Sequence, residues 1–214
     1  MLAVDVGGSH VKVLASDQTE RRRAVSGPTM TAEEMVSQAR AAAEGWNFDV
    51  VSVGIPAPVH GGRVVAEPMN LGTGWVGYDF EQAFGKPTKV INDAAMQALG
   101  SYDGGKMLFV GLGTGLGTAL IDNNAIEPME LAHLPFKKKK TFEDYAGERA
   151  RRQLGNKRWS KAVVEVVEAL AQALEPDYIV LGGGNAPKLT ELPANSRLGN
   201  NLDAFTGGFR LWSA

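Results

Sequence analysis

The chain has 214 residues, no cysteine and a formal net charge of −2, a length that accommodates one large domain or two small ones. The lack of cysteine excludes disulfides and thiolate zinc sites, and the near-neutral charge gives no global field that favours nucleic acid. The longest uncharged run, Met107–Ile121, is too short to span a bilayer, and no basic segment precedes an apolar stretch near Met1. We therefore expect a soluble, cytoplasmic protein with no membrane or nucleic-acid partner.

Strand and helix patterns alternate along the first half of the chain. Leu2–Val6 and Val11–Ala15 predict two strands, with Gly7-Gly8 in the hairpin turn between them. Ala24-Val25 is a candidate edge strand, and Thr31–Trp46 is the first clear helix, because Thr31 and Glu34 fit a capping box. The remaining elements of this half are a strand at Val50–Ile55, a long Gly- and Pro-rich loop at Ala57–Gly77, a strand at Lys89–Ile91 and a helix at Ala94–Leu99.

A second strand–glycine turn–strand unit opens the other half. Met107–Val110 leads into Gly111–Gly117 and then Thr118–Ile121. After it we expect helices at Phe142–Leu154 and Trp159–Leu174, a buried strand at Tyr178–Leu181, and a loop-like last thirty residues that close with Phe205–Trp212. The repeated opening predicts an α/β fold of two similar lobes, residues 1–93, completed by 200–214, and residues 94–199.

Each glycine turn has the size and composition of a phosphate-binding turn. Gly7 and Gly8 let backbone N–H groups approach phosphate oxygens, and Ser9 and Lys12 add a hydroxyl donor and a positive charge. The alternative for one such turn is a plain hairpin, but the chain contains two. The second has Gly113, Thr114 and Gly115 in the same setting and matches neither a dinucleotide fingerprint nor a P-loop.

A third glycine cluster, Gly182–Gly184, follows the Tyr178–Leu181 strand. Glycine at Gly183 would let a nucleotide base or ribose pack on the backbone. A tight strand-to-loop turn is the alternative for this cluster.

Asn92 and Asp93 end a predicted strand, where polar groups point into the crevice of an α/β sheet. A carboxylate there can accept the proton of a hydroxyl that attacks phosphorus, and the asparagine can orient a sugar. A helix N-cap is the ordinary alternative for such a dipeptide.

Further polar residues fit contacts to a small polyol. Glu130 and His133 are three residues apart, and Glu143 opens the next helix. A buried histidine with satisfied hydrogen bonds is the alternative for His133. The run Lys137–Lys140 is either a solvated loop or a contact for a polyanion such as inorganic polyphosphate.

Together these motifs resemble the repressor–ORF–kinase (ROK) family of sugar kinases, and within it the polyphosphate glucokinase branch. The resemblance covers nearly the whole chain in the family's motif order. The matching segments are Asp5–Lys12, Gly54–Val59, Asn70–Trp75, Ile91–Ala94, Gly111–Gly117, Glu130–His133 and Leu181–Asn185.

The resemblance implies a two-lobed actin-like ATPase (ribonuclease H-like) fold with the active site in the interlobe cleft. It implies a homodimer that uses Mg²⁺ and transfers a phosphoryl group from ATP or polyphosphate to the 6-hydroxyl of glucose, without zinc. Asp93 would be the base and Asp5 would lie near the metal, through water. The implied sugar contacts are Asn70, Asn92, Glu130, His133 and Glu143.

Two positions depart from the family pattern, because Ala57 and Ala132 replace glycines beside the expected sugar pocket. A kinase for mannose, fructose or an N-acetylhexosamine, and a sugar- or nucleotide-binding protein without catalysis, are therefore the alternative functions.

Overall fold

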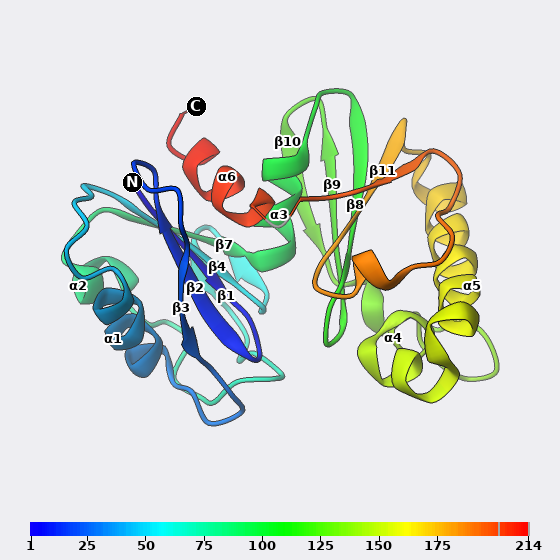
Figure 1. The fold of residues 1–214 in the computed structure, drawn as a ribbon, viewed down its shortest axis with the longest axis horizontal. Coiled ribbons are helices and arrows are strands. Elements are labelled where there is room, and N and C mark those ends of the chain that lie inside the picture. Colours follow the sequence, from blue (N-terminus) through cyan, green and yellow to red (C-terminus); the bar gives the residue numbers. More distant parts are fainter. Residues whose placement is uncertain (201, 214) are drawn as a thin grey trace. The chain divides into compact units, whose positions relative to one another are not determined.

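The computed structural model describes residues 1–200 and 202–213, which form two compact α/β units (Figure 1). The first unit contains Met1–Gly100 and the C-terminal segment from Leu202, and the second runs from Ser101. The first unit extends beyond Asp93, the boundary expected from the sequence. Helix α3 (Asp93–Ser101) belongs to it because a Cβ on Gly100 would collide with the backbone of Asp203 in the C-terminal helix.

The first unit is built on a five-stranded sheet with the order β3-β2-β1-β4-β7. β1, β2 and β3 are antiparallel neighbours, whereas β4 runs parallel to β1 and β7 parallel to β4. Besides α3, the elements of this unit in chain order are β1 (Leu2–Val6), β2 (His10–Ala15), β3 (Arg22–Val25), α1 (Ala32–Ala42), β4 (Val51–Ile55), the small hairpin β5 (Val59–His60) and β6 (Arg63–Val64), α2 (Phe80–Phe84), β7 (Thr88–Asn92) and α6 (Asp203–Arg210).

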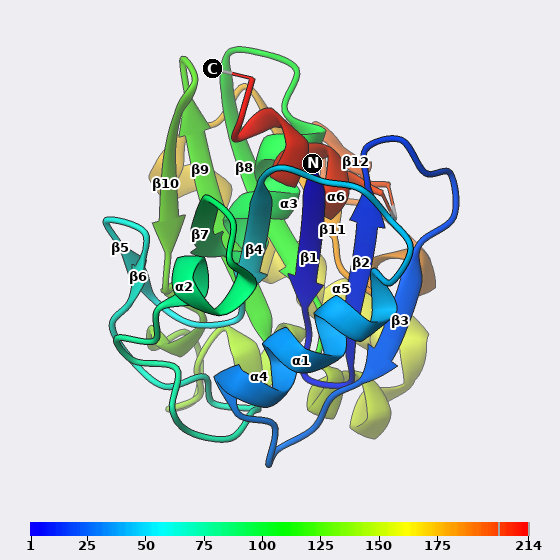
Figure 2. The same cartoon turned by 90° about the vertical axis from the view of Figure 1, so that its left-hand side faces the viewer.

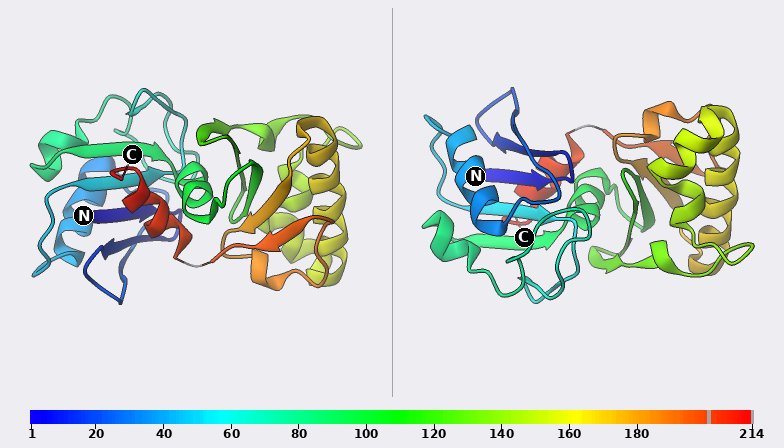
Figure 3. Two further views of the ribbon diagram at one scale, coloured as in Figure 1. Left: turned by 90° about the horizontal axis from the view of Figure 1, so that it is seen from above. Right: turned by 90° about the horizontal axis from the view of Figure 1, so that it is seen from below.

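Alternation along β1 buries both faces of this sheet. Leu2, Val4 and Val6 join the core that includes Met35 of α1, whereas Ala3 packs with Phe205 of α6. Helices α1 and α6 accordingly lie on opposite faces of the sheet (Figures 2 and 3). The capping box predicted for α1 is confirmed, since Glu34 N–H donates to Thr31 Oγ1 (3.2 Å) and Thr31 N–H donates to Glu34 Oε2 (2.9 Å).

The prediction of a loop-like C-terminal segment is wrong, because Asp203–Arg210 is the helix α6. Gly207 and Gly208 lower the intrinsic helix propensity of this segment. In the structure both glycines are buried, and a Cβ on Gly207 would collide with the Met96 carbonyl oxygen of α3. The glycines are therefore compatible with a helix whose backbone lies directly against its neighbours.

The second unit repeats this plan with a five-stranded sheet of order β10-β9-β8-β11-β12. β8, β9 and β10 are antiparallel neighbours, whereas β11 runs parallel to β8 and β12 parallel to β11. Its elements are β8 (Lys106–Leu112), β9 (Leu116–Asp122), β10 (Ala125–Met129), the 3₁₀ turn η1 (Leu131–His133), α4 (Glu143–Ala146), α5 (Glu148–Leu174), β11 (Tyr178–Gly182), the 3₁₀ turn η2 (Ala186–Lys188) and β12 (Ser196–Leu198).

The long helix α5 covers one face of the second sheet. Trp159, Val163 and Val167 of α5 share a core with Leu108 and Leu181. The predicted helix at Phe142–Leu154 is wrong in its bounds. The short helix α4 ends before Gly147, and α5 begins at once and continues to Leu174 with a non-helical residue at Gly155 (φ 72°, ψ 159°). Both interruptions fall on glycine, and the positive φ at Gly155 is one that glycine adopts without steric cost.

Candidate active site

The first glycine turn, Gly7–Ser9, joins β1 to β2 in the predicted hairpin. Gly7 N–H donates to the His10 carbonyl oxygen (3.0 Å). Ser26 braces the turn from beyond β3, because its hydroxyl donates to the Gly7 carbonyl (2.5 Å) and its N–H to the Ser9 carbonyl (3.0 Å). Gly8 is partly buried and the Ser9 residue is exposed. Sequence reasoning missed Ser26, since nothing in its local pattern marks it.

Asp5 and Lys12 are cross-strand partners on β1 and β2. Lys12 Nζ lies 2.8 Å from Asp5 Oδ2, and the Asp5 residue is 7% exposed. The pair therefore fixes one negative and one positive group beside the first turn.

Asn92 and Asp93 lie where β7 meets α3, at the edge where the three parallel strands of the first sheet end. Gly54 on β4 pairs with Asp5 on β1, and Ile55 pairs with Asn92 on β7. The carboxyl edge of such strands is where α/β sheets bind ligands. The structure thus brings Asp5, Asn92 and Asp93 to one edge of one sheet.

The side chain of Asn92 has structural partners. Its Oδ1 accepts from Ala95 N–H (3.1 Å), as a helix N-cap does, and its Nδ2 donates to the Ala57 carbonyl (3.2 Å). Asp93 Oδ1 accepts from Ala94 N–H (2.8 Å), and the residue is half-buried. Asn92 therefore acts as the helix N-cap of α3, whereas Asp93 is the more exposed of the two residues.

Asn70 lies in the long loop between β6 and α2 and is exposed. The loop is held directly after it, since Leu71 is buried and Gly72 N–H donates to the Met30 carbonyl (2.9 Å). A Cβ on Gly72 would lie 2.5 Å from the Thr29 carbonyl oxygen, so the loop backbone is closely packed next to Asn70.

The second turn, Gly113–Gly115, joins β8 to β9 in the predicted hairpin. Glu143 holds its far end, because Leu116 N–H donates to Glu143 Oε2 (3.1 Å). A Cβ on Gly115 would collide with that same oxygen. Glycine at Gly115 is therefore what allows the carboxylate to lie under the turn.

Two further contacts hold the carbonyl oxygens of this turn. Glu148 N–H donates to the Thr114 carbonyl (3.2 Å), and Asn185 Nδ2 donates to the Gly113 carbonyl (3.0 Å). Sequence reasoning assigned no role to Glu148 or Asn185. The position of Asn185 directly after the third glycine cluster was the available signal.

Gly183 has a structural requirement of its own. Its φ is +82°, and a Cβ there would lie 2.5 Å from the Leu112 carbonyl oxygen. Asn185 N–H donates to that carbonyl (2.9 Å). Gly183 thus forms the tight turn that the alternative interpretation expects, and its backbone packs against the end of β8.

Glu130, His133 and Glu143 form one electrostatic group in the second unit. Desolvation of the Glu130 carboxyl raises its pKa although much of the residue is exposed, His133 lowers that pKa, and Glu143 raises it. His133 is exposed in η1, so the buried-histidine alternative is wrong. Carboxylate and imidazole groups can accept and donate hydrogen bonds to the hydroxyls of a small polyol.

The methyl groups of Ala57 and Ala132 point into the cores rather than to solvent. Each residue is 3% exposed, Ala57 in the core of the first unit and Ala132 in that of the second. The departures at these positions are therefore accommodated by packing.

Lys137–Lys140 form the tip of an exposed hairpin closed by a bridge between Pro135 and Thr141. Lys137 Nζ lies 2.8 Å from Glu165 Oε2 on α5 and 4.9 Å from the centre of the Phe136 ring. Lys138 and Lys139 have positive φ. The run is thus an ordered, solvent-facing turn.

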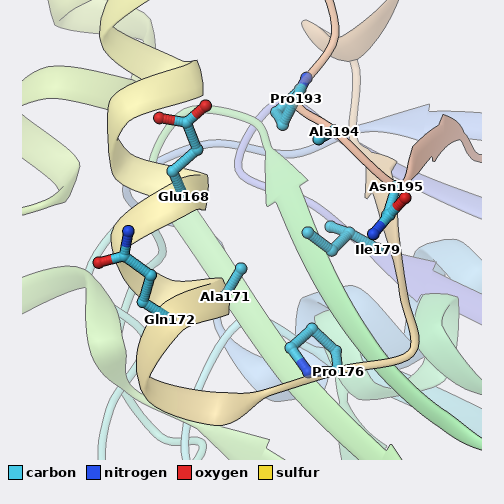
Figure 4. A pocket seen from close by; sticks show the side chains of 8 residues that line it. All are labelled: Glu168, Ala171, Gln172, Pro176, Ile179, Pro193, Ala194 and Asn195. Atoms are coloured by element: carbon cyan, nitrogen blue, oxygen red, sulfur yellow. The ribbon is translucent and has the colours of Figure 1, made fainter.

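A pocket of about 440 Å³ lies elsewhere in the second unit, between the end of α5 and the segment before β12 (Figure 4). It shares no residue with the sites described above. Its lining residues are Glu168, Ala171, Gln172, Pro176, Ile179, Pro193, Ala194 and Asn195. Among the described residues, the helices are too short or too polar to cross a bilayer.

The chain is similar in sequence and in fold to several sugar kinases. A polyphosphate glucokinase from Mycobacterium tuberculosis is 27% identical over 139 residues, which cover 58% of this chain and 52% of the relative, so the chain spans about half the length of that relative. The crystal structure of an inorganic polyphosphate/ATP-glucomannokinase from Arthrobacter sp. strain KM superposes with a TM-score of 0.84 at 23% identity, covering 97% of this chain and 95% of that one.

A ROK family glucokinase from Streptomyces griseus, solved with glucose and AMPPNP, has a TM-score of 0.77 at 18% identity and covers 98% of both chains. These likenesses identify the actin-like fold, which the sequence predicted. The family model described as "ROK family" matches residues 1–128. With more than half of its length matched by this model, the chain belongs to the ROK family.

Proposed function

We propose that this protein is a sugar kinase that transfers a phosphoryl group from polyphosphate, ATP or both to the 6-hydroxyl of glucose. The observation that carries the proposal is the position of Asp93 at the carboxyl edge of the parallel strands, the same edge of the sheet as Asp5, within a chain of the ROK family. Kinase chemistry is a property of that family's named relatives, and the choice of glucose follows the polyphosphate glucokinase likeness.

Asp93 is the proposed general base. As the sugar 6-oxygen attacks the terminal phosphorus, Asp93 takes the hydroxyl proton. The bond from that phosphorus to its bridging oxygen breaks, leaving ADP or a polyphosphate shorter by one unit. Phosphoryl transfer depends mainly on positioning and charge stabilisation, so the remaining proposed residues act by holding the two substrates.

Glu130, His133 and Glu143 are the proposed sugar contacts in the second unit, together with Asn70 and Asn92 in the first. The Asn92 side chain also caps α3, so we assign it a supporting role at the base of the sugar site. The proposed donor contacts are the backbone N–H groups and small side chains of the two glycine turns and of the third cluster, with Lys12. These are Gly7, Gly8, Ser9, Gly113, Thr114, Gly115 and Gly183.

Mg²⁺ is the proposed companion of the donor. Within residues 1–200 and 202–213, no group of three or more His, Asp or Glu side chains could hold a metal by itself. A kinase magnesium ion needs fewer protein ligands, since it keeps several waters and binds substrate phosphates. Asp5, already paired with Lys12, fits contact through water, and the ion would neutralise charge on the phosphates.

The proposal is tested by a coupled assay that crosses glucose, mannose, fructose and an N-acetylhexosamine with ATP and polyphosphate, in the presence of Mg²⁺. Formation of glucose 6-phosphate is the expected result. Mannose is the strongest alternative acceptor, because the Arthrobacter structure is that of a glucomannokinase. Absence of turnover with every pair, combined with thermal stabilisation by a sugar, would instead identify a binding protein.

Asp93→Asn tests the proposed base. Because its amide oxygen can still accept from Ala94 N–H, the fold should remain intact. Turnover should fall by roughly 10²–10⁴-fold, the usual contribution of a general base. A variant with near-normal turnover would reject Asp93 in this role.

The lysine hairpin is a proposed contact for long polyphosphate. Neutralising Lys137–Lys140 to glutamine should raise the KM for long-chain polyphosphate more than the KM for ATP, since each lysine removed weakens attraction to an extended polyanion. Equal changes for both donors would leave the run as a solvated turn.

We further propose that the protein is a cytoplasmic homodimer. Light scattering on purified protein would test the dimer.

A further inference from the structure

Positive charge is concentrated in one segment of the second unit. Residues 137–161 contain ten of the 22 lysines and arginines of the chain and three acidic residues. This segment covers the lysine hairpin, α4 and the first half of α5. In a chain with a net charge of −2, such a local excess of cations is the kind of patch that holds an anionic ligand.

Two of these cations are attached to the second glycine turn through one carboxylate. Glu148 accepts from Arg151 Nε (2.7 Å) and Nη2 (2.8 Å) and from Arg152 Nε (2.8 Å). The backbone N–H of the same Glu148 donates to the Thr114 carbonyl (3.2 Å). Glu148 therefore links both guanidinium groups to the turn.

A third cation reaches the turn from the other side. Lys188 Nζ donates to Asn185 Oδ1 (2.7 Å), and Asn185 Nδ2 donates to the Gly113 carbonyl (3.0 Å). Asn185, which is 6% exposed, also hydrogen-bonds to Glu148. Arg151, Arg152 and Lys188 thus form one connected cationic cluster, the name used for these three residues below.

The cluster carries more positive than negative charge, and part of this positive charge is exposed to solvent. Its two arginines lower the pKa of Glu148 far below the usual range, so one full negative charge faces three positive ones. Arg151 is fixed on both sides, because its Nη1 also donates to Asn156 Oδ1 (3.0 Å). The Arg152 side chain is 76% exposed and Lys188 is an exposed residue, so these two can meet a ligand.

We propose that the cationic cluster is an anion subsite that binds the phosphates of an inorganic polyphosphate chain behind the one being transferred. The inference rests on the proposed function, in which the Gly113–Gly115 turn holds donor phosphates. A polyphosphate carries charge along its whole length, whereas ATP ends in an uncharged nucleoside. Cations attached to the turn from two sides therefore favour the longer phosphate chain.

The cluster is separate from the lysine hairpin. Lys137 of the hairpin contacts Glu165, which lies 17 residues beyond Glu148 along α5. The interruption at Gly155 also lies between these two positions of α5. We expect a three-phosphate chain to bind at the cluster alone, and a long chain to contact both sites.

Donor length therefore distinguishes the two sites. The test compares Arg152→Gln, Lys188→Gln and their double variant with Lys161→Gln, a matched loss of an exposed cation further along α5. The double variant should raise the KM for tripolyphosphate and for long polyphosphate about tenfold or more, because hydrogen bonds to charged groups are lost. The KM for ATP should rise less, and Lys161→Gln should leave the KM for tripolyphosphate unchanged.

Direct binding provides a readout that does not need turnover. Isothermal titration with tripolyphosphate should give weaker binding to the double variant, and the charge-preserving Arg152→Lys and Lys188→Arg variants should restore it. A merely structural role of the Arg152–Glu148 contact would not be rescued in this way. Equal KM increases for ATP and polyphosphate, or unchanged tripolyphosphate binding in the double variant, would overturn the subsite.

The two hypotheses fail differently. No turnover of the wild-type protein with any sugar and donor defeats the proposed function, while the titration still decides whether the cluster binds polyphosphate. A wild-type protein that turns over ATP but does not bind tripolyphosphate keeps the kinase and overturns the subsite.

Discussion

Gly115→Ala should disturb the second glycine turn through Glu143. A methyl group at Gly115 would collide with Glu143 Oε2, the oxygen that accepts from Leu116 N–H. Because the obstacle is a side-chain end, Glu143 can rotate away, but the hydrogen bond to the turn is then lost. Gly113→Ala is the matched control on the same turn, since a Cβ at Gly113 has no neighbour within 4 Å.

The expected cost follows from the contact that is lost. A hydrogen bond to a charged group contributes about 1.5–3 kcal/mol. In a unit of about 100 residues, each kcal/mol shifts the Tm by roughly 4–8 °C, so the melting temperature of the second unit should fall by roughly 6–24 °C. Gly113→Ala should keep the wild-type Tm while still raising the donor KM, if phosphate binds against the Gly113 backbone.

The assay combines thermal denaturation with hydrogen exchange of the Leu116 amide, which should lose protection in Gly115→Ala. A double-mutant cycle identifies the cause, because Glu143→Ala removes the obstacle. In that background Gly115→Ala should cost little further stability. A wild-type Tm with a protected Leu116 amide, or an undiminished loss in the Glu143→Ala background, would refute the reasoning.

Two further predictions concern stability. Glu148 has a depressed pKa in the fold because Arg151 and Arg152 hydrogen-bond to it, so its stabilisation is complete above its ordinary pKa of 4.5 and is lost as the pH falls below that value. The free energy of unfolding of Glu148→Gln should therefore be lower than that of wild type at pH 7 by of order 1–3 kcal/mol. Denaturant titrations at pH 7 and pH 3 should show a smaller difference between the two proteins at pH 3. A difference that does not change with pH contradicts the ion pairing. Gly207→Ala should destabilise the first unit by about 1–3 kcal/mol or more through overpacking against α3, whereas Gly27→Ala, whose Cβ would have no neighbour within 4 Å, should melt like wild type; a stabilised Gly207→Ala variant would mean that α6 is not closely docked.

Local patterns in the sequence were sufficient for much of the fold. Short apolar runs on either side of glycines predicted the two glycine-turn hairpins, and Thr31 with Glu34 predicted the start of α1, because these signals act between neighbours along the chain. Local patterns also predicted a strand and a helix on either side of Asp93, and so placed this residue at the end of a strand.

The sequence patterns did not identify the supports of the candidate site. Ser26, Glu148 and Asn185 hold the glycine turns through one or two hydrogen bonds each to backbone atoms. Such contacts leave no periodic pattern, because each depends on where a whole element docks. The exposure of His133 and the burial of the Ala132 methyl were likewise decided by the packing of η1.

The C-terminal helix separates the two kinds of information most clearly. By itself the segment with Gly207 and Gly208 indicates a loop, since glycine disfavours an isolated helix. In the fold, Ser52 Oγ donates to the Gly208 carbonyl (2.5 Å) and Trp212 Nε1 donates to Ser52 Oγ (2.9 Å), across more than 150 residues of sequence. The sequence alone therefore determined which residues can form strands, caps and turns, and only tertiary packing decided that these glycines belong to a helix held against α3 and the first sheet.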